Sequence, residues 1–191
     1  MEYYVYGRKE MTKKQNSLIN ELINFLPENE KSVYREIVNC MVGLGYIPQK
    51  QKVKDFDLSF KHKINNKVIA KVGIHRKKGN LRIKFFACRD VPEKFIKALL
   101  DEAVANENRY SMEVTPPDRS PMLSNGIMKK CTSGCTVCTG GGMRYYYRHP
   151  NGMEIYRCGA YPVVIPDIDE TDMDDLKRLI MEQHNYFQSI A

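Results

Sequence analysis

No stretch of the sequence approaches the ~20 consecutive apolar residues that a membrane-spanning helix requires. Residues 1–6 also lack the charged and apolar blocks of a secretory signal peptide. These two absences predict a cytoplasmic protein that has no membrane partner. Since the cytoplasm is reducing, the 6 cysteines are poor candidates for disulfide bonds.

Signatures of common catalytic and nucleic-acid-binding sites are missing as well. The sequence has no nucleophile elbow and no His-Glu-x-x-His motif, and its 4 histidines are scattered without the spacing of metal ligands. It also has no helix-turn-helix, no aromatic pair typical of RNA-binding domains and no glycine-rich phosphate loop. The sequence therefore favours a binding protein over an enzyme.

The composition is that of a folded protein. Of the 191 residues, 42% are hydrophobic and 28% are charged, which is well away from the composition of disordered chains. A chain of this length buries roughly 70% of its unfolded surface in one core. We therefore expect a single domain spanning residues 1–191.

The N-terminal part of the chain predicts two helices. Apolar residues recur at helical spacing in residues 12–26, and Pro27 ends the pattern. A second helical stripe runs from Val33 to Leu44, where neighbouring glycines supply a C-terminal stop. The opening of the chain is therefore expected to be a helical hairpin.

A three-stranded antiparallel meander is expected next. Apolar and polar residues alternate in residues 56–60, 68–74 and 81–85, and turn residues occupy positions 65–66 and 77–80. Pro92 then fits the first turn of a helix whose apolar stripe can cover the meander. These elements form the predicted unit of residues 16–104.

The rest of the chain divides into three predicted segments. Residues 105–130 contain prolines and few periodic apolar residues, and they read as a surface connection. Residues 131–165 contain a cysteine cluster and a hairpin signature, and an acidic start introduces a last helix over residues 168–188. The predicted class is α+β: a helical hairpin, an antiparallel sheet covered by helices on one face, a four-cysteine loop with a hairpin, and a C-terminal helix.

The cysteine cluster predicts a metal site. Three thiols lie on one glycine-rich loop and a fourth returns on a strand, a pattern that suits tetrahedral zinc. The predicted ligands are Cys131, Cys135, Cys138 and Cys158. An iron–sulfur cluster on the same ligands is the alternative cofactor. Radical SAM chemistry shares the spacing of the first three cysteines, but too little chain follows the motif for the barrel that such chemistry needs.

The second candidate site is a basic face on the meander. Because side chains alternate across a strand, the face opposite the apolar one carries a series of lysines and arginines. The predicted anion-binding residues are Lys61, Lys63, Lys67, Lys71, Arg76, Lys77, Lys78, Arg82 and Lys84. The expected partner is anionic, either nucleic acid or a phosphate or carboxylate ligand. The alternative function is an enzyme or metal chaperone with a pocket near the four-cysteine hairpin, where residues 145–147 are all tyrosine.

The two helices, the Gly45-Tyr46-Ile47-Pro48 segment and the meander give residues 16–104 a family resemblance. This part of the chain resembles the small YdhG-like bacterial domains, whose relatives include frataxin-like iron chaperones. The resemblance implies a frataxin-like fold. It does not imply iron delivery, because the acidic surface of such chaperones is replaced here by a basic one.

Overall fold

The computed structural model describes residues 11–105, 128–130, 143–148, 154–159 and 161–190. Within these ranges the chain forms four α-helices, one short 3-10 helix and two antiparallel sheets. This mixture confirms the α+β class. None of the helices in the described ranges has the length and apolar character needed to cross a membrane.

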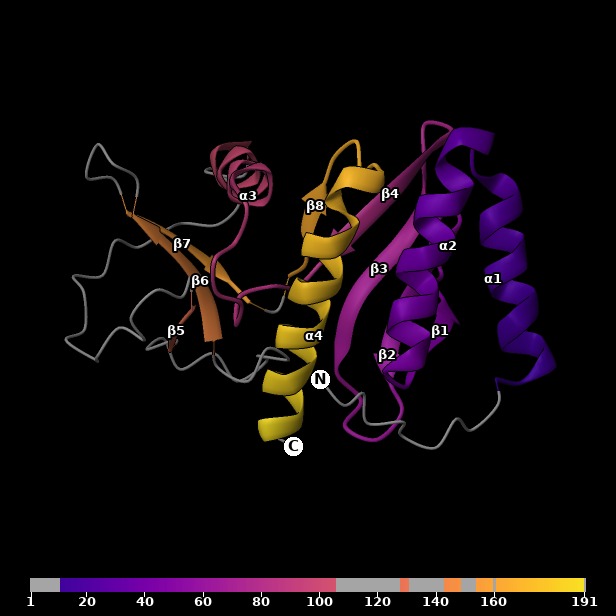
Figure 1. The fold of residues 1–191 in the computed structure, drawn as a ribbon, viewed down its shortest axis with the longest axis horizontal. Coiled ribbons are helices and arrows are strands. Elements are labelled where there is room, and N and C mark those ends of the chain that lie inside the picture. The colour runs from indigo at the N-terminus through magenta and orange to yellow at the C-terminus, as the bar shows by residue number, and fades with distance from the viewer. Residues whose placement is uncertain (1–10, 106–127, 131–142, 149–153, 160, 191) are drawn as a thin grey trace.

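Two helices open the fold, as the apolar stripes predicted. Helix α1 (Lys13–Phe25) begins at Thr12, whose side chain and that of Gln15 cap each other's backbone N–H groups. Pro27 separates it from α2 (Glu28–Gly43), and the chain leaves α2 through Gly45, which has a φ of 87°. The two helices pack against each other (Figure 1).

The larger sheet has five strands in the order β1-β2-β3-β4-β8. Its strands are β1 (Tyr46–Lys50), β2 (Asp57–His62), β3 (Val68–His75), β4 (Lys78–Ile83) and β8 (Val163–Ile165). The predicted meander is confirmed as β2, β3 and β4, which pair in sequence. The meander is extended at one edge by β1 and at the other by β8.

The turn between β3 and β4 lies earlier than predicted. His75 pairs with Lys78, so the turn consists of Arg76 and Lys77, whose φ angles are 49° and 66°. Gly79, which suggested a turn in the sequence, instead lies within β4. An added Cβ at Gly79 would approach the Tyr34 ring within 2.4 Å, so the glycine allows the strand to pass close to α2.

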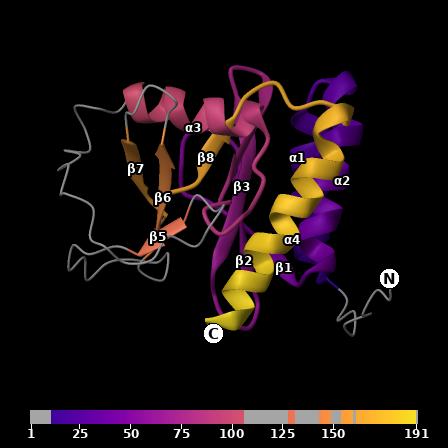
Figure 2. The same ribbon diagram turned by 60° about the vertical axis from the view of Figure 1, so that its left-hand side comes forward.

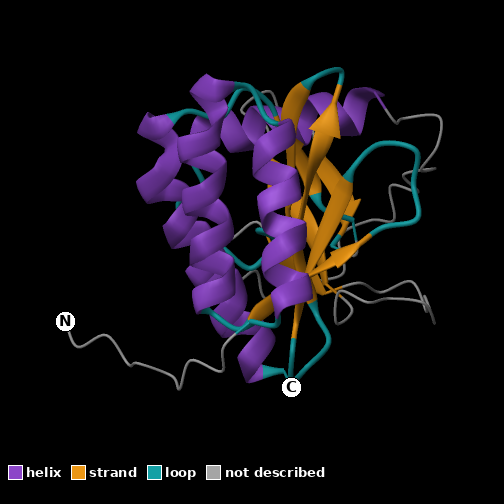
Figure 3. Ribbon diagram, turned by 90° about the vertical axis from the view of Figure 1, so that its right-hand side faces the viewer, coloured by secondary structure: helices purple, strands orange, loops and turns teal. Residues whose placement is uncertain are grey.

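Three helices cover one face of this sheet. Helices α1 and α2 contact β1, while the C-terminal helix α4 (Met173–Ser189) contacts α2 and β3 (Figures 1 and 3). The residues that form the centre of this layer are fully buried and include Leu22, Ile37, Phe60, Leu81 and Leu176. The short 3-10 helix η1 (Glu170–Asp172) and α4 confirm the predicted last helix and its acidic start.

Helix α3 (Glu93–Ala105) protects the outer edge of the sheet at β8 (Figure 2). The Glu102 carboxylate accepts a hydrogen bond of 2.9 Å from the Val164 N–H, a donor on the edge strand. The Phe95 ring packs edge-on against Phe85, with 6.2 Å between ring centroids. Capping an edge strand in this way removes a template for pairing with another chain.

The smaller sheet has the order β5-β6-β7. Its strands are β5 (Met128–Lys130), β6 (Met143–Arg148) and β7 (Glu154–Cys158). Lys130 is paired with Met143, and Cys158 is paired with the next residue, Arg144. The C-terminal residues of β5 and β7 therefore lie at the same end of this sheet, on either side of the N-terminal end of β6.

Candidate anion-binding site

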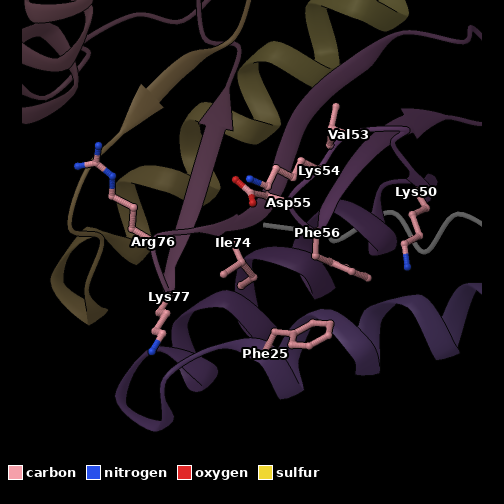
Figure 4. Close-up of a pocket in the computed structure, with 9 residues that line it drawn as sticks. All are labelled: Phe25, Lys50, Val53, Lys54, Asp55, Phe56, Ile74, Arg76 and Lys77. Atoms are coloured by element: carbon pink, nitrogen blue, oxygen red, sulfur yellow. The ribbon is translucent and has the colours of Figure 1, made fainter.

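A cleft of about 530 Å³ opens where the end of α1, the segment between β1 and β2, and the β3–β4 turn come together (Figure 4). Its apolar lining consists of Phe25, Val53, Phe56 and Ile74. Its charged lining consists of Lys50, Lys54, Asp55, Arg76 and Lys77. Four cations and one carboxylate give the cleft a positive potential, and its volume lies within the ~300–1,000 Å³ range of ligand sites.

The apolar lining contains two aromatic rings in contact. The ring centroids of Phe25 and Phe56 lie 5.3 Å apart at an interplanar angle of 50°. Phe56 packs partly against the core, whereas 56% of Phe25 is exposed. Phe25 is exposed because it is the last residue of α1 and lies outside the buried stripe of Ile19, Leu22 and Ile23.

The cations of the cleft differ in how they are paired. The Lys50 ammonium lies 4.5 Å from the centroid of the Phe56 ring and 3.1 Å from the Glu21 carboxylate. Lys54, Arg76 and Lys77 form no ion pair with any described residue. Figure 4 shows the charged ends of Lys50, Arg76 and Lys77 on different sides of the two rings.

Helix α2 holds the β3–β4 turn in place at the cleft. The Glu30 carboxylate accepts a hydrogen bond of 2.7 Å from the Gly79 N–H. Tyr34, one helical turn later, is buried against the same glycine. Burial raises the pKa of the Tyr34 hydroxyl above its ordinary range, so this ring stays neutral. The basic turn is thus attached to a helix and is not carried on a free loop.

The predicted basic residues are spread along the whole length of the meander. Lys61, Lys63 and Lys67 lie at the β2–β3 end of the meander, and Arg76, Lys77 and Lys78 lie at the β3–β4 end. The two ends are separated by the eight residues of β3, which span roughly 25 Å. Lys71 and Arg82 are neighbours between them.

Two of the predicted anion-binding residues are less accessible than the alternation suggested. Arg82 forms an ion pair with the buried carboxylate of Asp57. Lys84 is only 3% exposed, because β4 ends at Ile83 and the chain then enters the core at Phe85. Alternation sets the exposure of a side chain only within a strand, so it does not extend to Lys84.

A compact polar cluster occupies the face of the sheet opposite the helices. Besides the pair of Asp57 and Arg82, the Gln51 amide donates a hydrogen bond of 2.9 Å to the Ser59 hydroxyl. Gly73 is needed beside Asp57, since an added Cβ would lie 2.6 Å from the Phe56 carbonyl oxygen. The ion pair neutralises Arg82, whereas the three basic residues at the β3–β4 end, Arg76, Lys77 and Lys78, are all exposed.

A second cluster contains two histidines that the sequence did not connect. His62 ends β2 and His184 lies on α4, with 5.5 Å between the two ring centroids. The His62 Nδ1 accepts from the backbone N–H groups of Ile64 and Asn65 at 3.3 and 3.4 Å. Burial lowers the pKa of His62, and burial together with the charge of His62 lowers the pKa of His184. Both rings therefore favour the neutral form, in which the His62 Nδ1 can accept these hydrogen bonds.

The predicted metal ligands fall largely outside the described residues. Cys131, Cys135 and Cys138 lie there, and Cys158 is the last residue of β7. In the described ranges no three histidine, cysteine or acidic residues come together in a manner suited to a metal ion. The remaining cysteines, Cys40 and Cys88, are free thiols whose pKa is raised by burial, as expected for packing residues.

The comparisons with known proteins add no relative. No protein-family model matches the chain, and neither the curated proteins nor the solved structures contain a significant match. The resemblance of residues 16–104 to the YdhG-like domains therefore stays a prediction.

The cleft contains residues that the sequence analysis did not assign to a site. Phe25 falls in the predicted first helix and Phe56 in the predicted meander, whereas Lys50, Val53 and Lys54 were assigned to no site. One signal was available for Phe25, because an aromatic residue outside the apolar stripe of a helix cannot enter the core beneath it. The other lining residues come together only in the tertiary structure, so the sequence alone does not indicate that they share a site.

Proposed function

We propose that the protein is a non-enzymatic binding protein whose basic cleft takes an anionic partner. The observation that carries the proposal is a set of cations around an open concave site, Lys54, Arg76 and Lys77, none of which is paired with an acid in the described part of the chain. Such a site lowers the free energy of a bound anion by direct attraction and by release of condensed counterions. Of the residues first expected to bind an anion, Arg76 and Lys77 line this cleft, and Lys50 and Lys54 are added to them.

A zinc ion on Cys131, Cys135, Cys138 and Cys158 is part of the same proposal. The register of the small sheet supports it, because Lys130 and Cys158 lie at the same end of the three strands. Lys130 directly precedes Cys131 in the sequence. Two strand spacings of ~4.8 Å separate the backbones of Lys130 and Cys158. A metal with ligands next to both strands would hold this end of the sheet together and contribute directly to the free energy of folding.

Charge reversal at the turn tests the proposed binding surface. The variant Arg76→Glu, Lys77→Glu should weaken binding to heparin, a polyanion without bases, by about tenfold or more at low salt. The matched control, Lys63→Glu, Lys67→Glu, makes the same change of net charge at the other end of the meander and should weaken binding much less. Fluorescence titration at two salt concentrations measures both effects. Equal losses in the two variants would show that only net charge matters and would reject the cleft as the site.

A further inference from the structure

The exposed aromatic ring in the cleft is an unusual feature for a site that binds charge alone. Phe25 is 56% exposed and Val53 is 58% exposed, and both line a cleft whose other walls are cationic. A single exposed apolar side chain needs no explanation. Here, however, the apolar groups meet in a concave site, where a phosphate or carboxylate gains nothing from them.

The two aromatic rings are not equivalent. The Lys50 ammonium lies over Phe56, which also packs partly against the core. Among the described residues, no cation lies over Phe25, and its ring makes a tilted contact with Phe56. Phe25 is therefore the ring with surface available to a flat ligand.

The charged groups around the rings fit a chain of phosphates. Lys54, Arg76 and Lys77 come from two different segments, and none is neutralised by a described acidic residue. Figure 4 places Arg76 and Lys77 on one side of the ring pair and Lys50 on the other. A ligand that fits this arrangement has a flat apolar group with several negative charges beside it.

Single-stranded nucleic acid has this combination. Its bases can leave the stack and lie on an aromatic side chain, while its phosphates are held by surrounding lysines and arginines. Bases inside a duplex are covered on both faces by their neighbours and cannot stack on a side chain. From the geometry we infer that the cleft binds single-stranded nucleic acid, with one base stacked on Phe25 and the flanking phosphates on Lys54, Arg76 and Lys77.

This inference rests on the proposed anion-binding function and adds the class of ligand to it. The experiment compares two single strands of about 12 nucleotides, which is within the usual range of site sizes. One is an oligothymidylate, and the other has the same phosphates and sugars but no bases. Fluorescence anisotropy at low salt with the full chain gives the affinity for each strand. The oligothymidylate should bind about five- to 150-fold more tightly, which is the range expected for one stacked base.

Phe25→Leu identifies the stacking residue. The variant should reduce the affinity for oligothymidylate to nearly that for the abasic strand and leave the abasic strand unaffected. Ile64→Ala is the matched control, because Ile64 is 81% exposed beside basic residues at the other end of the meander. It should leave both affinities unchanged. Thermal unfolding of Phe25→Leu verifies that the exposed substitution does not disturb the fold.

The possible failures are distinguishable. If the protein binds both strands equally, or binds a duplex of the same length as tightly as the oligothymidylate, base stacking is rejected while anion binding stands. If the base-containing strand is preferred but Phe25→Leu has no effect, the stacking site is not this cleft. If neither strand nor heparin binds at low salt, the proposed function itself fails, and this inference fails with it.

Discussion

Glycines and histidines show how single residues fix the geometry of the sheet. Gly73 lies opposite Asp57 in the β2–β3 ladder, and the space of its missing side chain is filled by the Phe56 carbonyl and the Asp57 carboxylate. His62 accepts two backbone hydrogen bonds at the β2–β3 turn. Neither role is visible in the sequence, because each depends on atoms that come from elsewhere in the fold.

Gly73→Ala should destabilise the protein by about 1–3 kcal/mol, the usual cost of overpacking. The added Cβ would meet a backbone oxygen, which cannot move without disturbing β2. Gly43→Ala at the end of α2 is the control, since no atom lies within 4 Å of an added Cβ there. Urea unfolding of the two variants should separate them, with Gly43→Ala unchanged or slightly stabilised. Similar stabilities for both would contradict the close packing at Gly73.

Acid should destabilise the protein through the His62 and His184 pair. Because burial lowers the pKa of both rings, the unfolded chain binds more protons than the folded one below the ordinary histidine value of about 6.5. Stability is therefore complete above that pH and falls as the pH decreases through it. The urea midpoint should be lower at about pH 5.5 than at about pH 7.5.

His62→Asn assigns this acid effect to the pair. The asparagine oxygen can replace Nδ1 as an acceptor for Ile64 and Asn65, while the titrating group is removed. The variant should lose less stability between the two pH values than the wild-type protein. An equal loss would place the acid sensitivity in other groups.

At the scale of elements, the sequence pattern predicted the helices and strands that have a hydrophobic periodicity. It missed the features that depend on tertiary contacts. Helices α1, α2 and α4 and the meander carry clear apolar stripes. Strand β1 was missed because Pro48 interrupts its short pattern. Among the described strands β1 pairs with β2 alone, and such an edge strand tolerates a residue without an N–H. The cleft was not predicted, since its walls come from α1, the segment after β1 and the β3–β4 turn.

Glu30→Ala should loosen the β3–β4 turn from α2. The change removes the acceptor of the Gly79 N–H and should cost about 1–2 kcal/mol, with weaker heparin binding as a second effect. Glu28→Ala removes an acid from the same helical turn, but its partner is only the nearby Lys31. Glu30→Gln keeps an acceptor oxygen and should retain most of the stability. Equal urea midpoints for Glu30→Ala and Glu28→Ala would show that the link is unimportant.

At the scale of the whole molecule, the chain combines a covered sheet with a second, smaller sheet that ends in Cys158. The hydrophobic core lies between the five-stranded sheet and the three helices that cover one of its faces. The predicted zinc site includes Cys158 at the end of the smaller sheet, whose three strands contain 3, 6 and 5 residues. A metal is the kind of group that stabilises a short segment of this sort.

The purified protein should therefore contain one zinc ion per chain by elemental analysis. Cys158→Ser should lower the metal content and the melting temperature together, because metal binding contributes to folding. Cys40→Ser, a change of a half-buried thiol on α2, should leave the metal content unchanged. A stable protein without metal would reject the site, and visible absorption from an iron–sulfur cluster would replace zinc by the alternative cofactor.

The order of the strands also has a consequence for biosynthesis. Strand β8 completes the sheet beside β4, and α4 completes the helix layer beside α2, yet both lie after residue 160. A chain leaves the ribosome from its N-terminus, so the meander emerges well before the elements that cover it. Until then β4 presents an unpaired edge to other nascent chains. The closing steps of folding therefore await the synthesis of β8 and α4, and chaperones that shield strand edges should raise the yield of native protein.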